Sequence, residues 1–187
     1  MEPGQRIKTI TSKSGKEIIL RHPIMDDVDG MLAYINEISK EDTYITFSGE
    51  KISRDEEVRF LKNALERINE GNLIVISAYC DGLLIGVCHV ERNMAGRKRT
   101  HHVGKVGISI RKAYRNDGIG KTMLQSLIGL ARERLNLRIL TLNVYEPNIR
   151  AHKLYQSLGF SEYGKLPGGI LYRGEYVEEI EMYKPLR

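Results

Sequence analysis

One stretch decides the fold, and it reads VGISIRKAYRNDGIGKTMLQSLIGLARERLNLRILTLNVYEPNIRAHKLYQSLGF from Val106 to Phe160. Its first residues alternate between apolar side chains and glycine or serine, a pattern that predicts a half-buried strand. After a glycine-containing turn, one face of a predicted helix gathers Leu124, Leu127, Ile128, Ala131 and Leu135. A second alternating strand, 140–144, and a second helix that begins after Asn148 and ends at Gly159 complete the stretch. This order of elements predicts an α/β domain.

The turn between the first strand and the first helix indicates a site for a phosphorylated ligand. The first N–H groups of a helix have no partner within the helix, and here they point beyond the end of the strand. Gly118 and Gly120 have no Cβ, so the backbone can approach a ligand closely. Donors from Asn116 to Lys121 could converge on a pyrophosphate, and the side chains of Arg115 and Lys121 could add positive charge.

Two motifs in this stretch resemble the GNAT superfamily of N-acyltransferases, which use acetyl-CoA. They are the R-x-x-G-x-G turn from Arg115 to Gly120 and the N-x-x-A-x-x-L-Y-x-x-L-G-F run from Asn148 to Phe160, about one strand and one helix apart, as in the family. The resemblance implies an α/β fold with one N-acetyltransferase domain over residues 1–187, built on a mixed, mostly antiparallel central sheet flanked by helices. It also implies acetyl-CoA as cosubstrate, and we expect no metal.

The family pattern suggests which residues hold the donor. For its pyrophosphate they are the turn residues Arg115, Asn116, Asp117, Gly118, Ile119, Gly120 and Lys121. For its pantetheine arm the pattern suggests the backbone of Ile108, Ser109 and Ile110, together with the side chain of Asn148. Asn148 can equally be a helix cap, and both roles can hold. Asn143 is a further polar candidate, or it faces the other side of the sheet.

Tyr155 is the candidate for the catalytic acid. A phenol has a pKa of about 10 and could protonate the departing CoA thiolate, a role that the resemblance gives to the tyrosine of L-Y-x-x-L-G-F. The alternative is that Tyr155 only packs on the sheet. The general base stays open among Glu91, His101, His102 and a water chain, because the glutamate that some family members keep early in the fourth strand has no counterpart in His102–Lys105.

Competing nucleotide motifs fail at specific positions. Gly120-Lys121-Thr122 matches the end of a P-loop, but that motif requires glycine where Arg115 stands. The dinucleotide fingerprint would require glycine at Met123 and an acid near Leu140. Both readings are therefore set aside.

Composition narrows the class of protein and of partner. The 187 residues carry a net charge of +5, which favours polyanionic partners such as a phosphorylated cofactor. The basic run Arg92–Arg99 has no interleaved aromatic residue, so we expect a solvated hairpin tip and no nucleic-acid binding. Cys80 and Cys88 lie in apolar runs and read as buried thiols of a cytoplasmic protein. No apolar run reaches the ~20 residues of a membrane span, and the N-terminus lacks the apolar core of a signal peptide.

The rest of the chain adds helices and strands around this stretch. An extended arm precedes a strand at 16–21, the apolar spacing predicts helices at 25–39 and from Ser53 to Gly71, and Asp81-Gly82 predicts a hairpin turn. The other predicted strands are 73–80, 83–92, 103–111, 170–173 and 176–183.

The acceptor is less defined than the donor. We expect the loop 41–51 and the C-terminal strands to shape its site. The acids of the last strand are either solvated edge residues or attract a cationic amine. If one of them faces the cleft, alternation favours Glu178, beside Tyr176 and Ile180, over Glu179 on the other face. A small amine, an amino acid and a protein N-terminus all stay open as acceptors, and a homodimer stays open as the assembly. No cysteine lies in the matched motifs, which favours direct attack in a ternary complex. The alternative is a catalytically silent acyl-CoA-binding module of the same fold.

Overall fold

The computed structural model describes residues 2–41, 43–95 and 97–186. The predicted loops 41–51 and 93–100 each contain one residue outside this set, at positions 42 and 96.

Eight strands of the described chain form one sheet in the order β1-β2-β3-β4-β5-β6-β8-β7. Only the β5–β6 pair is parallel, and all other neighbours are antiparallel. The predicted mixed, mostly antiparallel sheet is therefore confirmed. The strands are β1 (Arg6–Thr11), β2 (Glu17–Arg21), β3 (Leu73–Cys80), β4 (Leu83–Arg92), β5 (Val103–Ile110), β6 (Ile139–Tyr145), β7 (Ser161–Tyr172) and β8 (Glu175–Pro185).

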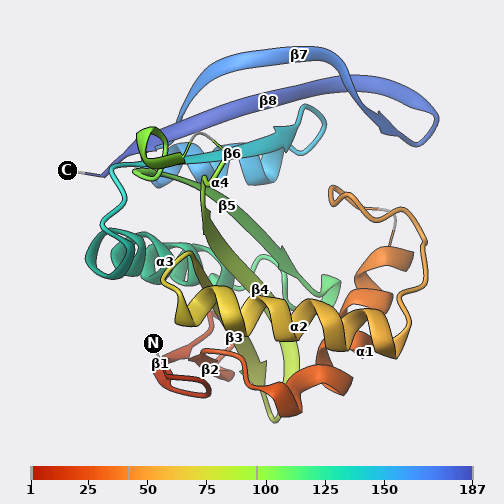
Figure 1. Cartoon of the computed structure of the whole chain (residues 1–187). Coiled ribbons are helices and arrows are strands. Elements are labelled where there is room, and N and C mark those ends of the chain that lie inside the picture. The colour runs from red at the N-terminus through yellow and green to blue at the C-terminus, as the bar shows by residue number, and fades with distance from the viewer. Residues whose placement is uncertain (1, 42, 96, 187) are drawn as a thin grey trace.

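Helices cover both faces of the sheet (Figure 1). One face packs against α1 (Val28–Lys40) and α2 (Arg54–Asn69), and the other packs against α3 (Ile119–Leu135) and α4 (Ile149–Ser157). The larger apolar core lies under α3 and α4. Short 3₁₀ turns stand at Met25–Asp27, Arg97–Arg99 and Lys112–Tyr114.

Local sequence signals account for most element ends. Asp81 and Gly82 both have positive φ, +48° and +78°, as a tight two-residue hairpin turn requires. Ser53 accepts a hydrogen bond from the Glu56 N–H, and Glu56 bonds back to the Ser53 N–H, so α2 begins with the predicted capping box.

Two predictions of strand bounds were wrong. The N-terminal arm is a full strand, β1, paired with β2. The segment after Phe160 is extended from Ser161 onward, not only from Ile170, and it forms the long hairpin β7–β8 that arches over the top of Figure 1. Glycine and proline between Gly164 and Gly169 suggested a loop, but they stand at two irregularities of register that the pairing with β8 tolerates.

The parallel pair β5–β6 opens into a fork. Pairing is confined to Val103–Lys105 against Ile139–Thr141, although both strands continue for several residues. Beyond Lys105 the edge of β5 that faces β6 therefore has no strand partner. This edge is what positions the site.

Two absences complete the description. In the described part of the chain no helix is both long enough and apolar enough to cross a membrane. The same residues contain no cluster of histidine, cysteine and carboxylate side chains suited to a metal ion. Cys80 and Cys88 are buried free thiols, as predicted.

Candidate active site

A cleft of about 1620 Å³ occupies the fork between β5 and β6. Its walls include residues 106–110 of β5, residues 143–145 of β6, the glycine turn before α3 and the first turns of α4. The loop 43–47 closes one side. The cleft thus collects in one place most of the residues that the sequence singled out.

The glycine turn presents its backbone to this cleft. Gly118 is the N-cap residue of α3 and has φ +82°, a conformation that glycine adopts without strain. At Gly120 a Cβ would stand 3.1 Å from Ile110 Cδ1 and 3.7 Å from Ile108 Cδ1, so this residue packs closely on β5. A helix start that is open to a cleft supplies unpaired N–H donors and a positive end of the helix dipole.

Cationic side chains that line the cleft include Lys13 from the β1–β2 turn, Lys121 from α3 and Arg150 from α4. Lys13 was missed by the sequence reasoning because it lies more than a hundred residues before the turn. These positive charges, together with the backbone N–H groups of the turn, suit the negative oxygens of a pyrophosphate.

Three of the predicted donor-binding residues have side chains that are engaged elsewhere in the structure. The Asp117 carboxylate accepts hydrogen bonds from the Ser14 N–H at 2.7 Å and the Ser14 hydroxyl at 2.6 Å, which holds the pKa of Asp117 below its usual value. Ile119 is buried in the core. Neither side chain lines the cleft, and the backbone N–H role predicted for both residues stays a prediction. Arg115 does line the cleft, but it pairs with Glu41 at 2.5 Å and donates to the Ile110 carbonyl at 2.7 Å. Its charge is therefore largely compensated.

The backbone of Ile108, Ser109 and Ile110 offers hydrogen-bonding groups along the open edge of β5. The other edge of the strand is paired with β4, Ile108 opposite Cys88 and Ser109 opposite Val87. The Ser109 hydroxyl lies 2.8 Å from that of Tyr34, which fixes α1 against this strand. An extended ligand with amide groups could add to the open edge as a further strand does.

Asn148 and Asn143 both line the cleft, from the start of α4 and from β6. The Asn148 side chain accepts a hydrogen bond from the Ala151 N–H at 3.2 Å, so the helix cap is present. That contact uses the amide oxygen and leaves the NH₂ group without a hydrogen-bond partner among the described residues. The contacts predicted between these two residues and acetyl-CoA stay predictions.

Tyr155 reaches the cleft from α4 and is 8% exposed. Its ring packs edge-on against Phe160, with centroids 6.0 Å apart, and its hydroxyl has no hydrogen-bond partner among the described residues. Burial raises the pKa of Tyr155 to about 12, with a smaller effect from Cys88. The phenol is therefore protonated at neutral pH, as a proton donor must be.

The three candidates for the base differ in placement. Glu91 lines the cleft, but its carboxylate pairs with Arg67 of α2 at 2.7 Å and is 47% exposed. His101 and His102 lie in the turn before β5, at the end of that strand remote from the glycine turn, and neither lines the cleft. His89 does line it, although the sequence reasoning passed over it. The sequence held one signal for it: His89 is two residues from Glu91 on one predicted strand, so both side chains point to the same face.

One end of the cleft is aromatic and acidic. Tyr44 from the loop, Tyr145 at the end of β6 and Tyr172 at the end of β7 form a cluster, with the Tyr44 and Tyr172 ring centroids 4.9 Å apart. Glu179 of β8 lies opposite Tyr145 in the sheet and lines the cleft.

The prediction that Glu178 faces inward was wrong. Glu178 lies on the other face of β8 and pairs with Lys165 at 3.2 Å, whereas Glu179 faces the cleft. Alternation was read correctly, but the apolar neighbour Ile180 points into the core beside α4 and not into the cleft.

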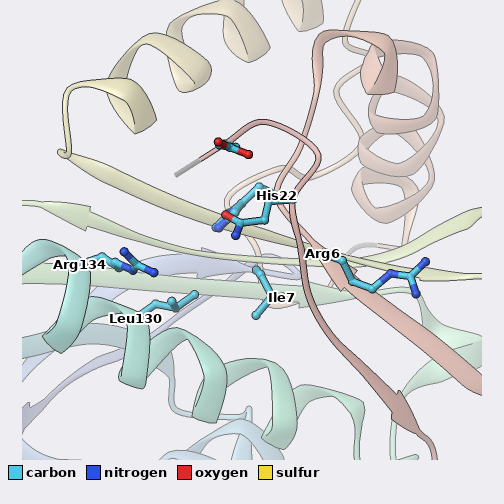
Figure 2. Close-up of a pocket in the computed structure, with 7 residues that line it drawn as sticks. Arg6, Ile7, His22, Leu130 and Arg134 are labelled. Atoms are coloured by element: carbon cyan, nitrogen blue, oxygen red, sulfur yellow. The ribbon is translucent and has the colours of Figure 1, made fainter.

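A second cavity of about 420 Å³ lies between the N-terminal segment and α3 (Figure 2). Figure 2 shows Arg134 and Leu130 reaching from α3 toward His22 and Ile7, while the Arg6 side chain points away from them. Glu2 also lines this cavity, and the His22 Nδ1 is bonded to the Val75 carbonyl at 2.8 Å. Mixed charges and the lack of a glycine cradle make it a poorer site than the cleft.

A forked sheet with a glycine turn on its cleft is what the motifs of an acyltransferase imply, and comparisons with known proteins agree with that class. The model of the acetyltransferase (GNAT) family matches residues 32–160, so the chain belongs to that family, as its motifs predicted. An L-amino acid N-acetyltransferase of Escherichia coli (strain K12) is 29% identical over 105 residues, which is 56% of this chain and 64% of that protein. A probable spermine N(1)-acetyltransferase of Bacillus subtilis subsp. natto is 40% identical over 57 residues, 30% of this chain and 38% of that protein. The matches thus span less than two thirds of either relative.

Solved structures extend the likeness to nearly the whole chain. A GNAT-family acetyltransferase from Streptococcus pneumoniae superimposes with a TM-score of 0.82 at 27% identity, covering 91% of this chain and 99% of that one. A phosphinothricin acetyltransferase from Sinorhizobium meliloti, solved with acetyl-CoA, has a TM-score of 0.76 at 18% identity and covers 95% of this chain and 89% of that one. The second likeness concerns the fold alone.

Proposed function

We propose that this chain transfers an acetyl group from acetyl-CoA to a primary amine, by direct attack of the amine within a ternary complex. The observation that carries the proposal is the fork between β5 and β6. It offers an open strand edge at Ile108–Ile110, a glycine turn at a helix start, and a protonated tyrosine, all on one cleft.

The donor would lie along that edge with its pyrophosphate at the turn. Backbone groups of Ile108–Ile110 would pair with the pantetheine amides, and the N–H groups of residues 116–121 with the phosphate oxygens. The lining cations Lys13, Lys121 and Arg150 would compensate the phosphate charge. Asp117 and Ile119 would contribute only their backbone.

The chemistry then requires two proton transfers. The acceptor ammonium loses a proton to a base, the amine nitrogen forms a bond to the thioester carbon, and the carbon–sulfur bond breaks. Tyr155 would give its proton to the departing CoA thiolate, and the proton that the new amide nitrogen loses would restore the phenol. No cysteine lies on the motifs that form the donor site, which favours this direct route over an acyl-enzyme.

The acceptor would be a cationic amine held at the end of the cleft bounded by Tyr44, Tyr145 and Glu179. A carboxylate and aromatic faces both attract a positive charge. The curated relatives are named for amino acids and for spermine, and both classes of acceptor fit this end. Peptide N-termini stay a third class, and both the cytoplasmic location and the homodimer stay predictions.

The test is thiol release from acetyl-CoA with spermidine, an L-amino acid and an alanine-terminated peptide as acceptors. We expect release with at least one of them and a rise in melting temperature on addition of CoA. Thermal stabilisation by CoA with no release across a wide amine panel would instead indicate the silent acyl-CoA-binding module.

A further inference from the structure

The imidazole of His89 fills the space that a side chain at Gly107 would need. The two residues lie directly opposite each other in the β4–β5 pairing. A Cβ on Gly107 would stand 2.4 Å from Cε1 and 2.9 Å from Nε2 of the ring, so no other residue fits there without displacing the imidazole. The ring therefore lies on the cleft wall next to Ile108, where the proposed donor-binding edge begins.

Both ring nitrogens of His89 are available to a ligand. Neither makes a hydrogen bond with any described residue, and the side chain is only partly buried. Among the described residues, the fully buried side-chain polar atoms without a hydrogen-bond partner belong to Ser77, Tyr79 and His101, so neither nitrogen of His89 is one of them. A group in the cleft, or a water bound there, can therefore reach the imidazole.

His89 and Tyr155 reach the cleft from opposite faces of the sheet. Tyr155 belongs to the core that contains Cys88, the residue before His89 on β4. Because side chains alternate along a strand, His89 points to the other face, together with Val87 and Glu91, toward α1 and α2. An acid on one side of the reacting bond and a base on the other suit a transfer in which one group enters while another leaves.

Burial favours the neutral form of the His89 imidazole. Burial lowers the pKa of His89 from its usual value, and Arg67 of α2 and Lys105 of β5 lower it further. Glu91 on the same strand opposes them and raises it, but its carboxylate is shared with Arg67. At neutral pH the ring can therefore accept a proton.

We propose that His89 is the general base of the transfer, taking a proton from the acceptor ammonium directly or through one water. The inference rests on the proposed function and names one residue of it. R–NH₃⁺ gives one proton to the His89 imidazole, which later releases it to solvent. The free amine then forms the C–N bond as the C–S bond breaks, and the products are R–NH–CO–CH₃ and CoA thiol.

Glu91 is the competing base on the same face. It is engaged by Arg67, and it lies two residues further along β4 than His89, opposite Lys105, where β5 is still paired with β6. A carboxylate in an ion pair is a weaker proton acceptor than a free imidazole near its own pKa. The two residues therefore make separable predictions.

The experiment measures the pH dependence of kcat/KM for the fastest of the three acceptors, in wild type and in His89→Gln. In wild type the rate should fall as the pH drops through the His89 pKa, below the ordinary value of about 6.5, because the neutral ring is the active form. In His89→Gln turnover at pH 7 should fall about 100-fold and this acidic limb should disappear, while the KM for acetyl-CoA stays the same. His102→Gln is the matched control, since that ring is exposed and outside the cleft.

A second pair of measurements separates catalysis from structure. Added imidazole should restore part of the activity of His89→Ala, which a purely structural role would not allow. The His89 ring, followed by NMR in the wild-type protein without substrate, should titrate below the ordinary histidine pKa. Wild-type activity in His89→Gln, an unshifted acidic limb, or full loss in Glu91→Gln with normal activity in His89→Gln would overturn the inference.

Failure of the proposed function looks different. If wild type releases no thiol with any acceptor, acetyl transfer itself is wrong, whatever His89 does. If wild type is active and the His89 variants are unchanged, only the assignment of the base is lost.

Discussion

Apart from Lys13, the proposed donor side of the cleft comes from one contiguous stretch, whereas the proposed acceptor side is assembled from segments far apart in sequence. Residues 106–121 carry the open strand edge and the glycine turn, and α4 belongs to the same stretch of residues 106–160. The acceptor side combines the loop 43–47, His89 of β4, Tyr145 of β6 and Glu179 of β8. The first arrangement can be predicted from a short stretch of sequence because it consists of backbone groups of a strand and a turn. The second depends on which strands become neighbours in the sheet.

Among the variants, Gly120→Glu should cause the largest loss of acetyl-CoA binding. The new side chain would meet Ile110 and Ile108 and bring a negative charge to the proposed pyrophosphate site. Stabilisation by acetyl-CoA, which follows mass action, should vanish, and turnover with it. Thermal-shift measurements with and without CoA check this. Gly129→Glu on the same helix is the matched control, because a Cβ there meets nothing within 4 Å. Undiminished CoA binding in a folded Gly120→Glu protein would contradict the donor site.

Tyr155→Phe should produce the next largest effect. The ring packing against Phe160 is kept while the proton is lost, so turnover should fall by about 10²-fold, the low end for positioned acid catalysis, with acetyl-CoA affinity almost unchanged. Steady-state kinetics and CoA titration measure the two quantities. Tyr163→Phe, an exposed tyrosine of β7, serves as the control. Equal turnover in Tyr155→Phe would mean that the thiolate leaves unaided or is protonated by another group.

Glu179→Gln tests the acceptor side against its immediate neighbour. Removing a charge at the cleft should raise the KM for a cationic amine by about fivefold, the equivalent of ~1 kcal/mol, and reduce the dependence of that KM on salt. Glu178→Gln removes the same charge from the other face of β8 and should leave KM unchanged. Kinetics at low and high ionic strength compare the two variants. If both variants raise KM equally, the amine responds to the summed negative charge of the β7–β8 hairpin and does not contact Glu179.

Asp117→Asn should have the smallest effect on acetyl-CoA affinity. It tests whether residue 117 of the glycine turn acts through its backbone or its side chain. The carboxylate accepts hydrogen bonds from Ser14 and does not line the cleft, so only the backbone N–H of residue 117 is proposed to meet acetyl-CoA. Acetyl-CoA affinity should stay within about twofold of wild type, since exposed polar contacts contribute little. Isothermal titration checks this, and a loss of tenfold or more would place the side chain back in the donor site.

Much of the fold was predictable because its signals are local. The capping box at Ser53, the Asp81-Gly82 turn and the positive φ of Gly118 each depend on a few neighbouring residues. Strand β7 was not fully predictable, because its glycines and proline suggest a loop until β8 supplies a partner. Pairing between distant segments overrides weak local preference.

The candidate site divides along the same line. The sequence by itself determined the glycine turn, the cap at Asn148 and the position of Tyr155 on a helix, since spacing along one chain fixes them. Only the tertiary structure decided that Arg115 pairs with Glu41, that Glu179 and not Glu178 faces the cleft, and that His89 lies over Gly107. Alternation along a strand gives two faces but does not say which face meets a cavity. That choice follows from which strands pair and where β5 and β6 separate, because only the packed sheet gives each face its surroundings.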